Sequence, residues 1–265
     1  ADVAAHICDL ASSLVASHPH VAGVAVAARR RRPVDRRYRL RHGHDARLGR
    51  HTPGALLQEA TGLKVRVLND VHAHGLGEAT LGAGQPYRSV LSIAVGTGIG
   101  GALVVDRQVS FGSRGIAGHV GHIHHHFAPD MTCSCGRKGH IESFCSGSGI
   151  TAWYNSLRGE SDPEVDGGRA LQELAESGNA LAAACFSRSA FALGEATASL
   201  VNCVDPGVVI LSGSMTRSGD IWWDALREGL RGLRDDPRCR QPPSSLVPLG
   251  GDAPLLGAVS FFLHV

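Results

Sequence analysis

The chain has 265 residues, of which 43% are hydrophobic and 19% charged, which is enough for one large or two modest domains with buried cores. This composition argues against wholesale disorder, and no apolar run approaches the ~18 residues of a transmembrane helix. The net charge of +2 conceals a strongly basic segment, because residues 29–50 contain ten arginines against two acidic residues. An odd number of cysteines, seven, without a visible secretory signal predicts free thiols and a cytoplasmic protein.

Apolar periodicity predicts helices and strands that alternate along the chain. In the first part we expect helices at 2–18, 53–61 and 71–84 and strands at 21–27 and 65–70. Beyond residue 88 we expect strands at 89–95, 101–106, 107–113, 207–214 and 244–250, the first two joined as a hairpin, and helices at 146–157, 168–177, 179–203, 221–233 and 254–265. This alternation predicts an α/β protein with mixed sheets.

The strongest chemical signal lies in the loop-rich segment 115–142, which contains the spacing H-x10-C-x-C-x4-H. Imidazole and thiolate are good ligands for Zn²⁺, and four of them make a closed tetrahedral site. The predicted ligands are His122, Cys133, Cys135 and His140, with His119, His124, His125 and His126 nearby as alternative histidines. The structural alternative is a pair of free cysteines in a histidine-rich loop.

Two polar residues, Asn69 and Asp70, end the predicted strand VRVLND. A carboxylate in that place can accept a proton from a sugar hydroxyl as a general base, and the neighbouring amide can hold adjacent hydroxyls. The structural alternative is that Asp70 caps the helix that follows.

A glycine turn, Gly96-Thr97-Gly98-Ile99-Gly100, connects two predicted strands. Glycines let backbone N–H groups approach a phosphate, and the Thr97 hydroxyl adds a donor, although glycine hairpins are also common without a ligand. Farther along, Glu142 follows His140 by two residues, so a metal that orders this loop would also hold the Glu142 carboxylate in place.

Taken together, the order ND…GTGIGG…GIAGHVGH…CSCGRKGHIE…SG resembles the ROK family of bacterial sugar kinases and sugar-responsive repressors. The resemblance is close over roughly residues 61–150 and extends in pattern through the rest of the C-terminal half. It implies an actin-like (ribonuclease-H-like) two-domain α/β fold with mixed sheets and an incomplete first domain. It also implies a sugar and ATP with Mg²⁺ between the domains, a structural Zn²⁺ and a homodimer.

The resemblance assigns roles to individual residues. Asp70 corresponds to the catalytic base and Asn69 to a sugar contact. The phosphate loop corresponds to Gly96, Thr97, Gly98 and Gly100, and Gly213 lies where the family has glycines near adenosine. His122 corresponds to a zinc ligand and sugar neighbour, and Glu142 to a sugar-binding Glu. Two positions depart from the pattern, because His140 replaces a third cysteine and His119 replaces a sugar-binding Glu.

The predicted domains are 1–88 and 89–265, the second with the zinc loop 119–142 and with the closing helix 254–265 able to pack back on the first. The family's D-x-G-x-T phosphate loop is absent from the sequence, which predicts either a fragment or a protein that has lost half of its phosphate clamp. The arginine-rich segment 28–51 is predicted to be exposed and outside the sugar site. It is either a loop for an anionic partner or a frame-shifted stretch.

Three functions fit these residues. The first is an ATP-dependent kinase for a hexose such as glucose or N-acetylmannosamine. The second is the sugar-binding effector domain of a ROK repressor, which would contact nucleic acid only through a helix-turn-helix upstream of residue 1. The third is a catalytically dead remnant that still folds around zinc. None of them predicts a membrane partner.

Overall fold

The computed structural model describes residues 3–28, 53–231, 244–246 and 249–264, so nearly all of the arginine-rich segment 28–51 lies outside the described residues. The helices are α1 (Val3–Ser17), α2 (Pro53–Thr61), α3 (Asp70–Leu81), α4 (Glu142–Cys145), α5 (Gly147–Leu157), α6 (Gly168–Glu176), α7 (Ala180–Val204), α8 (Gly219–Arg231) and α9 (Ala253–His264). The strands are β1 (Val24–Ala28), β2 (Val65–Asn69), β3 (Ser89–Val95), β4 (Ile99–Val105), β5 (Gln108–Val109), β6 (Val208–Ser212) and β7 (Ser244–Leu246).

The alternating pattern of strands and helices predicted from the sequence is confirmed, with bounds that mostly agree within a few residues. Two differences stand out. Strand β4 begins at Ile99, inside the expected glycine turn, and the strand expected at 107–113 is reduced to the two residues of β5. None of the helices in the described ranges combines the length and apolarity needed to cross a membrane.

The chain divides into two compact units. The first contains residues 1–88, 102–118 and 248–265, and the second contains residues 89–101 and 119–247. The division therefore falls at several points along the chain, because strand β4 begins in the second unit and continues in the first, and helix α9 belongs to the first.

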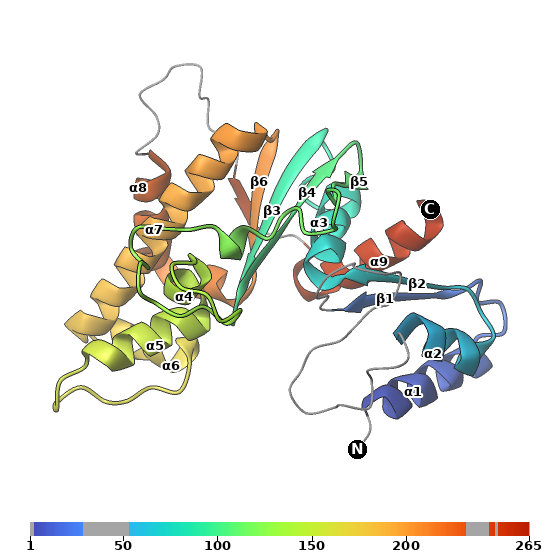
Figure 1. Ribbon diagram of the computed structural model, residues 1–265, viewed down its shortest axis with the longest axis horizontal. Coiled ribbons are helices and arrows are strands. Elements are labelled where there is room, and N and C mark those ends of the chain that lie inside the picture. The colour runs from blue at the N-terminus through green and yellow to red at the C-terminus, as the bar shows by residue number, and fades with distance from the viewer. Residues whose placement is uncertain (1–2, 29–52, 232–243, 247–248, 265) are drawn as a thin grey trace. The chain divides into compact units, whose positions relative to one another are not determined.

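The first unit is built on the parallel pair β1–β2, in which Val24 lies opposite Val65 and Ala28 opposite Asn69. Helix α2 packs on β2 and against α1, whereas α9 packs on both strands and against α3, so helices cover both faces of the pair (Figure 1). The α3–α9 contact depends on small residues, since a Cβ at Gly77 would collide with the carbonyl oxygen of Ala253. The junction of β2 and α3 is thereby held between packed elements.

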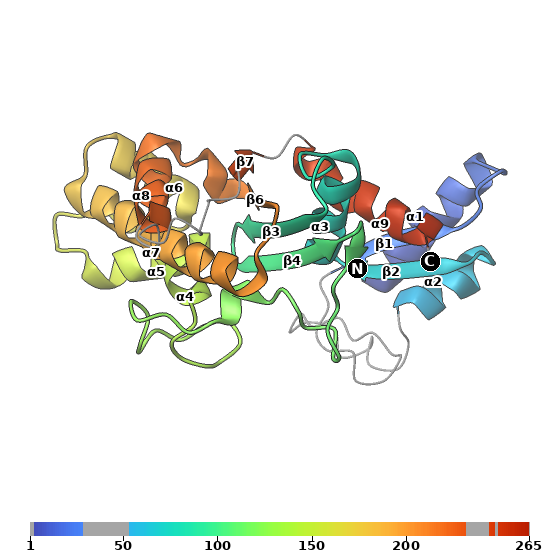
Figure 2. The ribbon, with the colours of Figure 1, turned by 90° about the horizontal axis from the view of Figure 1, so that it is seen from above.

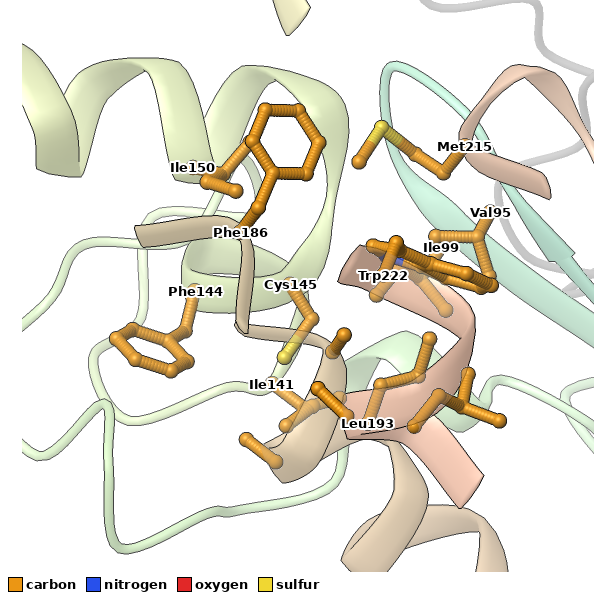
Figure 3. Close-up of a cluster of buried hydrophobic side chains, with 14 of the residues drawn as sticks. Val95, Ile99, Ile141, Phe144, Cys145, Ile150, Phe186, Leu193, Met215 and Trp222 are labelled. Atoms are coloured by element: carbon orange, nitrogen blue, oxygen red, sulfur yellow. The ribbon is translucent and has the colours of Figure 1, made fainter. Parts of the chain in front are cut away.

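The second unit contains the largest described apolar core. Strands β3 and β6 are parallel, with Val90 opposite Val208, within a sheet of order β5-β4-β3-β6-β7. Helices α4 to α8 gather beside β3 and β6 (Figure 2). Figure 3 shows how side chains from different helices meet in this core, among them Ile150 of α5, Phe186 of α7 and Trp222 of α8, each at most 1% exposed. This core supports the glycine turn and the cysteine- and histidine-containing loop.

Candidate functional site

The β2–α3 junction presents Asp70 in a fixed position. Asn69, not Asp70, is the N-cap of α3, because its Oδ1 accepts a hydrogen bond from the His72 N–H at 3.2 Å. The structural alternative in which Asp70 caps this helix is therefore wrong. Asp70 is the first helical residue, is half-buried, and its Oδ1 accepts hydrogen bonds from Asn69 Nδ2 and the Val71 N–H, both at 2.9 Å. These contacts orient the carboxylate.

Close to this junction, Phe111 and Ala117 contact helix α3. His72 is buried, its Nε2 lies 2.9 Å from the carbonyl oxygen of Ala117, and its ring meets the Phe111 ring edge-to-face. Sequence reasoning missed this contact, because it joins residues 45 positions apart. It ties the first turn of the helix that carries Asp70 to the remainder of the first unit.

In the second unit, the glycine turn between β3 and β4 is anchored to the start of α5. The Gly96 N–H donates to the Gly98 carbonyl at 2.9 Å, and the Gly96 carbonyl accepts from the Gly147 N–H at 2.7 Å. Ser148 Oγ donates to the Thr97 carbonyl at 2.6 Å. Thr97 itself is exposed, so its hydroxyl can reach a ligand, while Gly100 already belongs to β4.

Gly213 lies close to the same turn. Its φ of +93° is in the region that favours glycine, and a Cβ there would collide with the carbonyl oxygen of Val95, the last residue of β3. The next residue, Ser214, has its Oγ 3.6 Å from where a Cβ at Gly96 would stand. The structure thus brings together the predicted phosphate turn and the predicted adenosine-side glycine, although they are more than 110 positions apart.

The four predicted metal ligands also come together. One ligand atom from each of His122, Cys133, Cys135 and His140 lies within 4.8 Å of all the others. Cys133 Sγ is 3.5 Å from His122 Nδ1, and Cys135 Sγ is 3.2 Å from His140 Nδ1. Two imidazole nitrogens and two sulfurs at such distances are a suitable donor set for a tetrahedral cation. His119 is outside this group, with its ring centroid 6.1 Å from that of His122.

Backbone geometry explains how the loop brings the predicted ligands to one place. Gly136 has a φ of +84° and donates its N–H to the Cys133 carbonyl at 2.8 Å, which closes a tight turn around Ser134 and Cys135. On the other side, a Cβ at Gly121 would collide with the carbonyl oxygen of Ile99, so this glycine lets the short 3-10 helix Val120–His122 approach β4. Sequence reasoning did not identify Gly121.

Glu142 begins α4 and is buried beside the predicted metal ligands. Its Oε2 accepts from the Ile99 N–H at 3.0 Å, and its Oε1 accepts from Ser134 Oγ at 2.5 Å and from Cys133 Sγ at 3.4 Å. Burial alone would raise the pKa of Glu142, but these hydrogen bonds and nearby His122 lower it below its usual value. Glu142 therefore remains ionised at neutral pH. Ser134, between the two cysteines, is a second positioning residue that sequence reasoning missed.

Comparisons with known proteins agree with the family resemblance noted in the sequence. A family model described as "ROK family" matches residues 42–265. A glucokinase of Thermotoga maritima is 30% identical over 214 residues, which are 77% of this chain and 67% of that protein. Across the first three curated glucokinases that it matches, the chain spans between 59% and 67% of their length.

Solved structures agree. A ROK hexokinase from Thermus thermophilus is 30% identical with a TM-score of 0.83, covering 97% of this chain and 84% of that one. A ROK family glucokinase from Streptomyces griseus, solved in complex with glucose and AMPPNP, is 26% identical with a TM-score of 0.75, covering 97% of this chain and 87% of that one. The predicted actin-like fold of the ROK sugar kinases is thereby confirmed.

Proposed function

Because this chain belongs to the ROK family, we propose that it acts as an ATP-dependent sugar kinase for a hexose such as glucose or N-acetylmannosamine. The observation that carries the proposal is the geometry of Asp70. A carboxylate that serves only as a helix cap is not needed at this junction, because Asn69 already caps α3. Asp70 is instead oriented through Oδ1, and no hydrogen bond to its Oδ2 is found within the described residues.

In the proposed reaction, a sugar hydroxyl transfers its proton to Asp70 while its oxygen attacks the γ-phosphorus of ATP. The bond from that phosphorus to the bridging oxygen of the β-phosphate breaks, and ADP leaves. Mg²⁺ held by the nucleotide neutralises phosphate charge. The turn at Gly96, Thr97, Gly98 and Gly100 contributes donors to the phosphates, and Gly213 lets adenosine approach the backbone.

On the sugar side, the proposed contacts are Asn69, His119, His122 and Glu142. The low pKa of Glu142 favours an ionised acceptor, and an acceptor of that kind suits a sugar hydroxyl. The proposed cation of the four-ligand group is Zn²⁺, held by His122, Cys133, Cys135 and His140. It would stabilise the loop and, by holding Ser134 between two bound cysteines, keep the Ser134 hydroxyl in place to donate to Glu142. The homodimer stays a prediction.

The test is an ADP-release assay with a panel of hexoses and N-acetylhexosamines, combined with measurement of sugar binding by calorimetry. A kinase forms one ADP for each sugar phosphate, with a preference for particular sugars. Binding of a sugar without ADP formation at saturating ATP would contradict the proposal and favour the repressor effector domain. Absence of both binding and turnover in a folded, metal-loaded protein would favour the remnant.

A further inference from the structure

A second group of side chains able to ligate a metal lies outside the group of His122, Cys133, Cys135 and His140, and it has no part in the proposed kinase reaction. It consists of His125 and His126 in the loop and Glu195 on α7. We infer that His125, His126 and Glu195 bind a second divalent cation of the borderline class, such as Zn²⁺ or Co²⁺, which ties the loop to helix α7. The inference does not depend on the kinase proposal.

The geometry fits one shared ion. Glu195 Oε2 lies 3.8 Å from His125 Nε2 and 4.0 Å from His126 Nε2, and one ligand atom from each residue lies within 4.8 Å of the others. The two imidazole rings are stacked, with centroids 4.6 Å apart, so that both Nε2 atoms approach the same carboxylate oxygen. Zinc bonds of about 2.0–2.2 Å to nitrogen and oxygen require ligand atoms only slightly closer than this.

The same contacts are too long for hydrogen bonds, which end near ~3.2 Å for nitrogen and oxygen. Glu195 Oε2 is buried and has no hydrogen-bond partner within the described residues. A buried carboxylate oxygen without a partner is unfavourable, and a cation would supply the missing interaction. This orphaned oxygen is independent of the histidine pattern and points to the same place.

His125 is also in a suitable protonation state. Burial, then the neighbouring His126 and His124, lower the pKa of His125 to about 4, so this ring is neutral at pH 7 and cannot form an ion pair with Glu195. Neutral imidazole is the form that binds metals. Metal binding through Nε2 of His125 would move the ring proton to Nδ1. In the structure, Nδ1 accepts a weak hydrogen bond from the Phe127 N–H at 3.4 Å, and this contact would be lost. At that length the loss is small.

Both sides of the site are held by backbone contacts. The His125 N–H donates to the Gly139 carbonyl at 2.9 Å. Glu195 follows Gly194, where α7 and α8 approach so closely that a Cβ at Gly194 would collide with the Leu226 carbonyl. The His126 side chain is 66% exposed, which leaves a path for the ion and room for a water ligand. Three protein ligands and one open position are typical of an accessible zinc site.

The test is titration of metal-free protein with Co²⁺ under reducing conditions, followed by absorption spectroscopy. The first equivalent should produce intense thiolate-to-cobalt bands from the cysteine-containing site, and the second only weak d–d bands, for a total of about two ions per chain. Glu195→Gln and His126→Ala should each weaken binding of the second Co²⁺ ion at least about 100-fold. Substitution of residues that only support metal ligands already lowers metal affinity about 10–100-fold. Neither should change the thiolate bands.

The matched control is His124→Ala, which removes an exposed histidine of the same run that lies outside the group. It should retain both equivalents. The inference is overturned if the unchanged protein binds a single ion. It is also overturned if Glu195→Gln keeps the second ion at full affinity, or if His124→Ala removes it as effectively as His126→Ala does.

Discussion

The β2–α3 junction and the loop 119–142 both carry predicted site residues, but they are held by different kinds of contact. At the junction, Asp70 is positioned by hydrogen bonds between residues one to three positions apart. In the loop, Glu142 is positioned by Ile99, 43 positions away, and by Ser134, eight positions away. Asp70 is thus positioned by local hydrogen bonds at the helix start, whereas Glu142 depends on long-range contacts and, in our proposal, on a metal bound by the loop. The two regions should respond differently to substitution.

The largest expected effect is that of Cys135→Ala, which removes one of the four ligands. An ion present at about 1,000 times its Kd stabilises the folded state by about 4 kcal/mol, and that contribution should be lost. Metal analysis should show the loss of one ion, and hydrogen exchange should increase over residues 119–142 but not over residues 65–81. Cys203→Ala, at an exposed cysteine outside the group, is the control. Retention of the ion and of loop protection in Cys135→Ala would refute the ligand assignment.

A smaller effect is expected from Gly121→Ala. The added methyl group collides with the Ile99 carbonyl and pushes the 3-10 helix that carries His122 away from β4, at a cost of roughly 1–3 kcal/mol. The midpoint temperature of thermal unfolding and the affinity for Co²⁺ should both decrease. Gly167→Ala is the matched control, because no atom lies within 4 Å of a Cβ added there. Equal behaviour of the two variants would show that the close approach at Gly121 does not position the loop.

The smallest effect is expected at Asn69, where two variants separate its two roles. Asn69→Ala removes both the cap and the donor to Asp70, and should reduce the free energy of unfolding by about 1 kcal/mol. Asn69→Asp keeps a cap acceptor but replaces the donor with a second carboxylate beside Asp70, so it should recover only part of the lost stability while its turnover decreases. If Asn69→Asp matches the unchanged protein in turnover, the hydrogen bond to Asp70 has no positioning role.

The same contrast explains what the sequence could and could not predict. The bounds of β3 and α2 were predicted without error, since apolar runs and local turn residues define them. The grouping of His122, Cys133, Cys135 and His140 was predicted because their spacing is itself a chemical signal. The early start of β4 was missed because the Ile99 N–H is fixed by Glu142, far along the chain.

Other features depended equally on distant contacts. No sequence motif marks Gly121 as important. Its role is visible only in the structure, where a Cβ at this position would collide with the Ile99 carbonyl oxygen. The pairing of His125 and His126 with Glu195 joins a loop to a helix about 70 positions away, which no motif in the sequence indicates. The roles of the site residues toward sugar and nucleotide stay predictions.

The most direct measurement compares Asp70→Asn with the unchanged protein in turnover and in sugar binding. The amide keeps the size and the Oδ1 acceptor of the side chain but cannot take a proton from the sugar hydroxyl. We predict that kcat falls by ~10²–10⁴-fold, the usual range for general acid–base catalysis, while the Kd for the sugar changes little. An unchanged kcat would contradict the assignment of Asp70 as the base, and with it the account of this junction as a catalytic site.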